Sequence, residues 1–280
     1  MKNNDDFFVK FWGVRGSIPC PGSETIKYGG NTSSLEIRCG KNILLFDAGT
    51  GIKNLGQYLI ENKYNVGKIF LSHTHYDHIC GLPFFGPAYI PGNKIEIWAG
   101  HLDKKYTIKK IIENIMSEPI WPVGIDVFKS DLTFHDFSAG EKLEPYSGVL
   151  IKTCSLSHTN GATGYRIEYN GFSICYLTDT DHKPNILDKN ILNLIQGADL
   201  VIYDSMLTED EFSQKPHWGH STWEQGVKLC EAAKVKKFCV FHHDPDHNDS
   251  FMDNIAKQVA LKKPGSVVAT EGMILRPETF

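Results

Sequence analysis

Short apolar runs alternate with longer amphipathic segments along most of the chain. Apolar runs of about four to eight residues predict strands, and apolar residues recurring every three or four positions predict helices. The runs predict strands over 7–14, 33–39, 43–46, 68–71, 95–98, 149–154, 164–169, 172–177, 200–203, 238–241 and 267–275. The amphipathic segments predict helices over 52–62, 102–117, 185–196, 221–233 and 250–262. Strands separated by helices are typical of a layered α/β fold.

Glycine and proline mark the connections between these segments. Asn170-Gly171 predicts a two-residue hairpin turn, and residues 204–217 a polar linker. The Gly/Pro-rich stretch 13–32 either lines a substrate entrance, with Arg15 or its backbone meeting an anion, or is a plain connector. The segment 119–122, Pro-Ile-Trp-Pro, predicts a rigid surface turn with a buried Trp. A pocket wall or a homodimer contact is the alternative for this segment.

The composition excludes several classes of protein. The 280 residues can form one large domain over 1–280, and 29 basic against 33 acidic residues leave a formal charge of −4. No dedicated nucleic-acid surface is evident from this balance. The chain shows neither a membrane-length apolar run nor a signal peptide at its start. Its seven scattered cysteines are odd in number, which predicts reduced thiols in a cytoplasmic protein.

The densest chemistry lies in residues 71–78, Leu-Ser-His-Thr-His-Tyr-Asp-His, directly after the predicted strand 68–71. His73, His75, Asp77 and His78 place three imidazoles and one carboxylate within six residues. Zinc, manganese and iron accept these ligands. The set is too large for one tetrahedral metal that also holds water. The motif therefore predicts two divalent metal ions, with zinc preferred and manganese or iron as alternatives.

Other predicted strands also end in side chains that can bind metals. His158, Asp179 and the pair His242-His243 each follow a strand, as the central motif does. Asp47 follows the strand 43–46 in the same way. It either forms a hydrogen bond behind a ligating His or serves a turn or helix cap.

The spacing His-x-His-x-Asp-His after a strand resembles the metallo-β-lactamase superfamily. The resemblance implies a four-layer αββα sandwich with a dinuclear centre. It also assigns the ligands by position: His73, His75 and His158 to one metal, Asp77, His78 and His242 to the other, and Asp179 to both. His243 is the alternative to His242. A lactam hydrolase of this superfamily would carry Cys at position 179, and a flavodiiron oxidoreductase would carry Glu at position 75. This chain has Asp179 and His75 instead, which disfavours both activities.

A second motif bears on catalysis. Gly219-His220-Ser221-Thr222, with Glu224 close behind, resembles the His-containing loop of ribonuclease Z and related phosphodiesterases. The resemblance implies that His220 bonds a phosphate oxygen or protonates the leaving alkoxide. The alternative is that Ser221 or Thr222 only caps the next helix and His220 is incidental.

These motifs predict a dinuclear phosphodiesterase in which a metal-bound hydroxide, steered by Asp77, attacks phosphorus. Ribonuclease Z carries a tRNA-gripping arm between its third His and its bridging Asp, whereas residues 161–178 leave no room for one. A small cyclic nucleotide or other cyclic phosphodiester is therefore the expected substrate. The alternatives are tRNA 3′-end processing, a non-catalytic metal-containing ligand sensor, and a thioesterase of the glyoxalase type.

Overall fold

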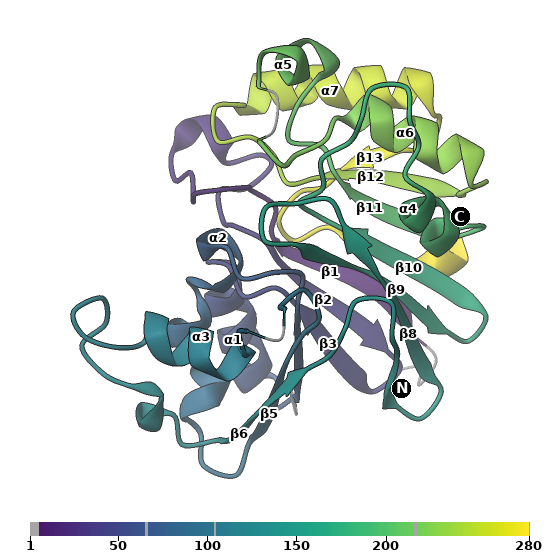
Figure 1. The fold of residues 1–280 in the computed structure, drawn as a ribbon. Coiled ribbons are helices and arrows are strands. Elements are labelled where there is room, and N and C mark those ends of the chain that lie inside the picture. Colours follow the sequence, from purple (N-terminus) through teal and green to yellow (C-terminus); the bar gives the residue numbers. More distant parts are fainter. Residues whose placement is uncertain (1–5, 65–66, 104, 216–217, 280) are drawn as a thin grey trace.

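Two β-sheets lie face to face in the computed structural model, which describes residues 6–64, 67–103, 105–215 and 218–279 (Figure 1). The first sheet contains, in spatial order, β14 (Ile274–Leu275), β1 (Phe7–Gly13), β2 (Ser34–Cys39), β3 (Asn42–Phe46), β4 (Lys68–Leu71), β5 (Lys94–Ala99) and β6 (Asp131–Asp136). The second contains β13 (Val267–Val268), β12 (Lys237–Phe241), β11 (Leu200–Asp204), β10 (Phe172–Leu177), β9 (Ala162–Tyr169), β8 (Val149–Leu156) and β7 (Lys142–Tyr146).

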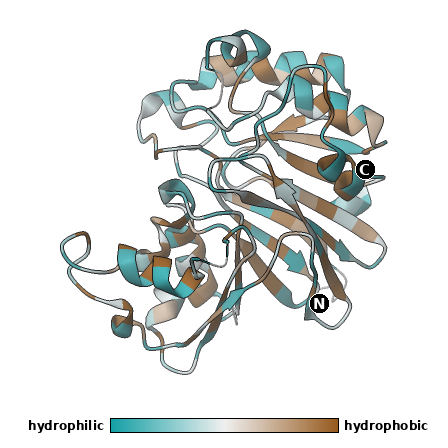
Figure 2. Ribbon diagram, viewed as in Figure 1, coloured by the Kyte–Doolittle hydropathy of each residue, from teal (hydrophilic) through white to brown (hydrophobic). Residues whose placement is uncertain are grey.

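Helices cover the outer face of each sheet. The first sheet carries α1 (Ile52–Glu61), α2 (Tyr76–Ile79) and α3 (Ile108–Ile115), and the second carries α4 (Lys189–Ile195), α5 (Glu209–Gln214), α6 (Trp223–Ala232) and α7 (Asp249–Lys262). Three clusters of buried side chains fill the spaces between these layers. Figure 2 shows the same division, with hydrophobic strands inside and polar helix surfaces outside. The predicted four-layer αββα sandwich is confirmed.

The strand directions determine where side chains with useful chemistry gather. Strands β3 to β6 run parallel in the first sheet, and β10 to β13 run parallel in the second. Strand β8 has the same direction as β10, because each is antiparallel to β9. The carboxyl ends of parallel strands meet at one edge of a sheet, where ligand sites of α/β folds lie. The strand-end residues singled out in the sequence therefore share one end of the sandwich.

Several predicted boundaries are wrong, for local reasons. Helix α3 begins only at Ile108, where Thr107 caps it, and α4 begins after its cap Asp188. The expected polar linker 204–217 contains α5, although its residues 216–217 lie outside the described part. The expected strand 267–275 is in fact two strands, β13 and β14, which belong to different sheets. The sequence does not predict β6 and β7, because their side chains are mostly polar and half-exposed or exposed.

The Gly/Pro-rich stretch 13–32 is tied to the second half of the molecule. Asp249 accepts the backbone N–H of Lys27, and Glu271 accepts that of Asn31. The Arg15 guanidinium is fully buried and donates to backbone carbonyls. The suggestion that Arg15 meets a substrate anion is therefore wrong.

The remaining sequence expectations concern the surface. Trp121 is half-buried against the helical layer and packs edge-on against Phe84, while Ile120 is 69% exposed. The seven cysteines are free thiols. Among the described helices, none combines the length and the apolar character needed to cross a bilayer. A homodimer and a cytoplasmic location stay predictions.

Two buried tyrosines of the second sheet reach across the sandwich to strand ends of the first. Tyr165 donates to the carbonyl of Leu71 at 2.6 Å, and Tyr176 to Asp47 Oδ2 at 2.6 Å. We predict that Tyr165→Phe lowers the free energy of unfolding by about 1–3 kcal/mol, because the buried carbonyl loses this donor. Denaturant unfolding measures the change. The exposed control Tyr106→Phe should stay within about 0.5 kcal/mol of the parent.

Candidate metal centre

One group of imidazoles comes from the β4–α2 loop and the end of β8. His73, His75 and His158 lie close enough to share one ion, with the two nitrogens His158 Nε2 and His75 Nδ1 3.0 Å apart. Asp179 Oδ1 faces the same group, at 3.7 Å from His73 Nε2 and 3.6 Å from His158 Nε2. These four side chains form the first candidate metal site.

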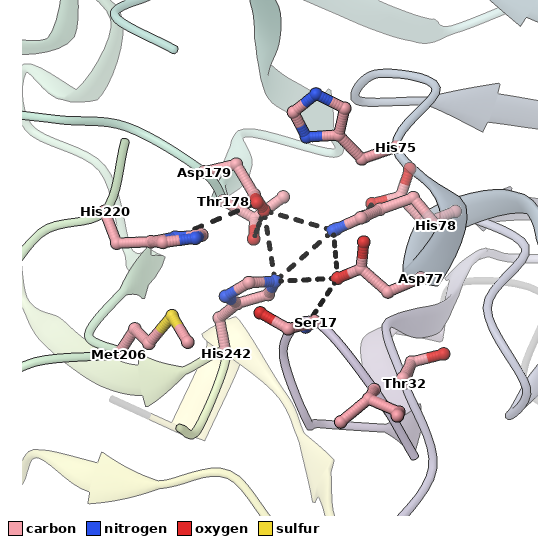
Figure 3. A network of polar contacts seen from close by, with 12 residues as sticks. Ser17, Thr32, His75, Asp77, His78, Thr178, Asp179, Met206, His220 and His242 are labelled. Atoms are coloured by element: carbon pink, nitrogen blue, oxygen red, sulfur yellow. Dashed lines mark hydrogen bonds and ion pairs between the residues drawn. The ribbon is translucent and has the colours of Figure 1, made fainter. Parts of the chain in front are cut away.

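A second group lies beside the first, and Figure 3 shows its members Asp77, His78, Asp179 and His242 pointing toward one another. His78 Nε2 is 3.2 Å from Asp77 Oδ2, 3.2 Å from Asp179 Oδ2 and 3.3 Å from His242 Nε2. His242 Nε2 is 3.4 Å from Asp77 Oδ2 and 3.2 Å from Asp179 Oδ2. A tetrahedral site with bonds of about 2.0–2.1 Å separates its ligand atoms by roughly 3.3–3.4 Å. The spacing of these four atoms fits such a site.

Asp179 belongs to both groups. Its Oδ1 faces His73 and His158, while its Oδ2 faces His78 and His242. The residue follows β10 and has a φ of 57°, in the left-handed region that non-glycine residues seldom adopt. The structure thus brings together all seven side chains that the sequence put forward as ligands.

Three of these imidazoles are held through the nitrogen that points away from the site. His78 Nδ1 donates to Asp47 Oδ2 at 2.8 Å, and His158 Nδ1 to the carbonyl of Gly219 at 2.7 Å. His73 Nδ1 lies 3.1 Å from the Ser72 hydroxyl. Such bonds fix the tautomer and the ring orientation of a metal ligand. Of the two alternatives for Asp47, a partner behind a ligating His is the one observed.

His242 is held differently from the other imidazoles. Its Nδ1 is buried and has no hydrogen-bond partner among the described residues, and the backbone of Gly16 lies against its ring. The ring of His220 stacks on it, with centroids 5.1 Å apart. The neighbouring His243 points elsewhere and bonds the carbonyl of Ala269. His242 rather than His243 therefore faces the site.

His220 lies beside both groups, and with Asp179 and His242 it forms a further trio whose ligand atoms are close enough to hold an ion. Its Nδ1 is 3.1 Å from Asp204 Oδ2 and 3.8 Å from Asp179 Oδ1. Burial alone would lower the pKa of His220, but Asp204 and Asp179 together raise it to about 9. Sequence reasoning missed Asp204. The sequence does contain a signal for Asp204, because this residue is the last of a buried strand, much as Asp47 directly follows one.

The electrostatics of the two groups suit cations. Burial would raise the pKa of Asp77 and of Asp179, yet nearby imidazoles hold both pKa values low, chiefly His78 for Asp77 and His242 for Asp179. Burial lowers the pKa of His73 well below its usual value, which keeps this ring neutral. Burial opposes a proton on His78 as well, but Asp77, Asp179 and Asp47 raise its pKa well above the usual value. The field that favours a proton there also favours a metal ion.

One unpaired atom tests the fit of a metal directly. His73 Nε2 is fully buried and has no hydrogen-bond partner among the described residues, although it points toward Asp179 Oδ1. A buried polar atom without a partner is costly, and a bound cation would satisfy it. The residues present therefore fit two divalent ions.

The remaining histidines lie outside the two groups. His182 bonds the Ser221 hydroxyl, His101 bonds Thr74, and His135 stacks on Trp98. His247 is only 5% exposed, donates to Glu211, and closes a turn through its N–H to the Asp244 carbonyl at 3.0 Å. Thr222 does cap α6, as the alternative for this loop proposed. Its neighbour His220 nevertheless faces the two groups.

Comparisons with known proteins agree with this fold. Residues 42–243 match the family described as the β-lactamase superfamily domain. A protein of Picrophilus torridus named ribonuclease Z is 26% identical over 298 aligned positions, which cover 90% of this chain and 91% of that protein. The metallo-β-lactamase fold protein YhfI from Bacillus subtilis superposes with a TM-score of 0.73 at 19% identity, covering 97% and 99% of the two chains. The short form of human tRNase Z gives 0.65 at 19% identity, covering 96% and 98%. The chain belongs to the β-lactamase superfamily, as its metal-binding motif predicts.

Proposed function

We propose that this chain is a dinuclear metal-dependent phosphodiesterase that hydrolyses a small cyclic nucleotide or another cyclic phosphodiester. The broader class of phosphodiester hydrolase is supported by relatives named ribonuclease Z. The observation that carries the proposal is the division of the Asp179 oxygens between two groups of imidazoles. His73, His75 and His158 would hold one ion, and Asp77, His78 and His242 the other.

The side chains divide the work of the reaction. When bound, two divalent ions lower the pKa of a water and neutralise charge on a phosphate. Asp77 uses Oδ2 in the contacts within its group, and we assign its Oδ1 to orienting the attacking water. Asp204 holds His220 through Nδ1, which leaves Nε2 to carry a proton toward the leaving oxygen.

Two features support a small substrate. Strands β9 and β10 are joined by Asn170-Gly171 alone, and only residues 157–161 connect β8 to β9. The stretch between His158 and Asp179 thus carries no arm that could grip a large RNA.

The arginines give the second feature. The guanidinium is the preferred group for bidentate phosphate recognition. The four arginines of the chain all have protein partners: Arg15 bonds carbonyls, Arg38 pairs with Glu36, Arg166 with Glu168, and Arg276 with Asp6. Contacts to a tRNA backbone would depend on lysines.

A second candidate function is the 3′-end processing of tRNA. The curated relatives named ribonuclease Z favour it, since they align over nearly the whole chain. The ligands and His220 of this chain would serve either substrate, because both reactions hydrolyse a phosphodiester. Substrate size and salt dependence separate the two candidates.

The first prediction concerns metal content. Purified protein should bind about two divalent ions per chain, as measured by elemental analysis after loading with zinc or manganese. Asp179→Ala should lower both occupancy and activity, because it removes a ligand from each group. The exposed control Asp126→Ala should bind the parent amount. Full activity at one ion per chain would contradict the dinuclear reading.

The second prediction concerns His220. His220→Ala should keep its metals but lower turnover by roughly 10²–10⁴-fold for a poor alkoxide leaving group. The loss should shrink for bis(p-nitrophenyl) phosphate, whose leaving group needs little protonation. Asp204→Asn should show the same dependence on leaving group, because it removes the negative charge beside His220 Nδ1 that favours the protonated ring.

His135→Ala is the matched control, since it removes an imidazole remote from the site. Parent rates for His220→Ala on every substrate would leave the loop a helix cap and contradict a catalytic role for His220. A loss of metal from that variant would make His220 a ligand.

The third prediction separates the two substrates. Cyclic nucleotides should be hydrolysed well and with weak dependence on salt, because few phosphates are neutralised on binding. Precursor tRNA should be cleaved poorly in the same buffers. Efficient tRNA cleavage that falls steeply between 50 and 200 mM salt, as expected for many phosphate contacts, would reverse the ranking.

A further inference from the structure

We propose that the turn Arg15-Gly16-Ser17 is a positioning element that holds the second metal site together from both halves of the molecule. Its backbone contacts His242, which follows a strand of the second sheet, and Asp77, which follows one of the first (Figure 3). The inference rests on the proposed metal centre. It concerns residues that lie outside the ligand set.

Gly16 restricts the His242 ring by direct contact. A Cβ added at Gly16 would lie 2.5 Å from Cε1 and 2.6 Å from Nδ1 of that ring. The other supported imidazoles are fixed by hydrogen bonds, whereas His242 Nδ1 has none among the described residues. The ring instead packs against the glycine backbone and against the rings of His220 and His78, whose centroids lie 5.1 and 5.4 Å away. Contact therefore replaces the hydrogen bond that usually orients a ligating imidazole.

Ser17 holds the carboxylate of the same site. Its backbone N–H donates to Asp77 Oδ2 at 2.8 Å, the oxygen that also faces His78 and His242. Ser17 has a φ of 60°, and the turn closes with a bond from Ile18 N–H to the Gly16 carbonyl at 2.7 Å. Non-glycine residues seldom adopt this left-handed conformation. The surrounding contacts must hold the residue in that conformation.

Arg15 supplies the anchor for this conformation. Its guanidinium is fully buried and donates to the carbonyls of Gly29 at 2.8 Å, Asp244 at 3.0 Å and His247 at 2.7 Å. Asp244 and His247 belong to the loop that begins with His242. The backbone adds a bond from Gly16 N–H to the His243 carbonyl at 3.0 Å. Arg15 thus fixes the turn to the segment that carries His242.

The decisive test is Gly16→Ala. The Gly16 backbone lies outside the left-handed region, so alanine adds only a methyl group that collides with the His242 ring. Titration of metal-free protein with zinc, followed by calorimetry, should show one of two binding events weakened by roughly 10–100-fold. The other event should be unchanged. A general defect in folding would weaken both events together, and far-UV circular dichroism with thermal unfolding of the metal-free protein monitors it.

Arg15→Lys provides a second test of the inference if Gly16→Ala does not fold. Lysine keeps the charge but cannot reach three carbonyls in a fork, so it should weaken the same event. Ile18→Ala alters a side chain that is 57% exposed, and this control should bind as the parent. Parent affinities in Gly16→Ala and Arg15→Lys, or equal loss of both events, would overturn the inference.

The parent protein keeps this inference separate from the proposed function. A parent that binds one ion refutes the dinuclear proposal. In that case, weaker binding of the single ion by Gly16→Ala still supports the positioning role of the turn. Unchanged binding of that ion refutes the role.

Discussion

The centre depends on carboxylates that the fold buries at the carboxyl ends of its parallel strands. Asp47, Asp179 and Asp204 are each at most 2% exposed. An unpaired buried carboxylate costs several kcal/mol, so each one requires donors or positive charge nearby. Asp47 receives them from the Ser72 backbone and hydroxyl, the Tyr176 hydroxyl and His78. The same bonds fix His78 and join the two sheets, so satisfying one charge also builds part of the site.

Backbone strain accompanies this arrangement. Asp47, Asp179 and His242 have φ values of 59°, 57° and 63°, and each lies within two residues of the end of a parallel strand. Non-glycine residues in this region cost about 1–3 kcal/mol each and persist only where their surroundings enforce them. In an extended backbone successive side chains alternate between sheet faces. The left-handed residues break that alternation and bring side chains of both sheets together, which is a function for the strain.

The sequence was informative where chemistry coincides with a strand end. The cluster 71–78 and Asp179 follow compact apolar runs, so their shared edge could be predicted before any coordinates were known. Asp47 stayed ambiguous, because a cap and a partner for His78 need the same residue type. Gly16 could not be assigned at all, since its role is the absence of a side chain beside a ring more than 220 residues away. Edge strands such as β6 escaped notice because half-exposed polar positions blur the period of two.

The metal centre by itself does not choose between a cyclic phosphodiester and an RNA. In the proposed reaction its ligands and His220 act on the phosphate, which both substrates share, so discrimination must come from surfaces that meet the rest of the substrate. A large RNA needs many cationic contacts beyond the scissile group. In this chain the short β9–β10 turn adds no such surface, and the arginines are engaged within the protein. A small substrate needs few contacts beyond the metal centre. The short turn and the engaged arginines are therefore stronger evidence about the size of the substrate than the ligand set is.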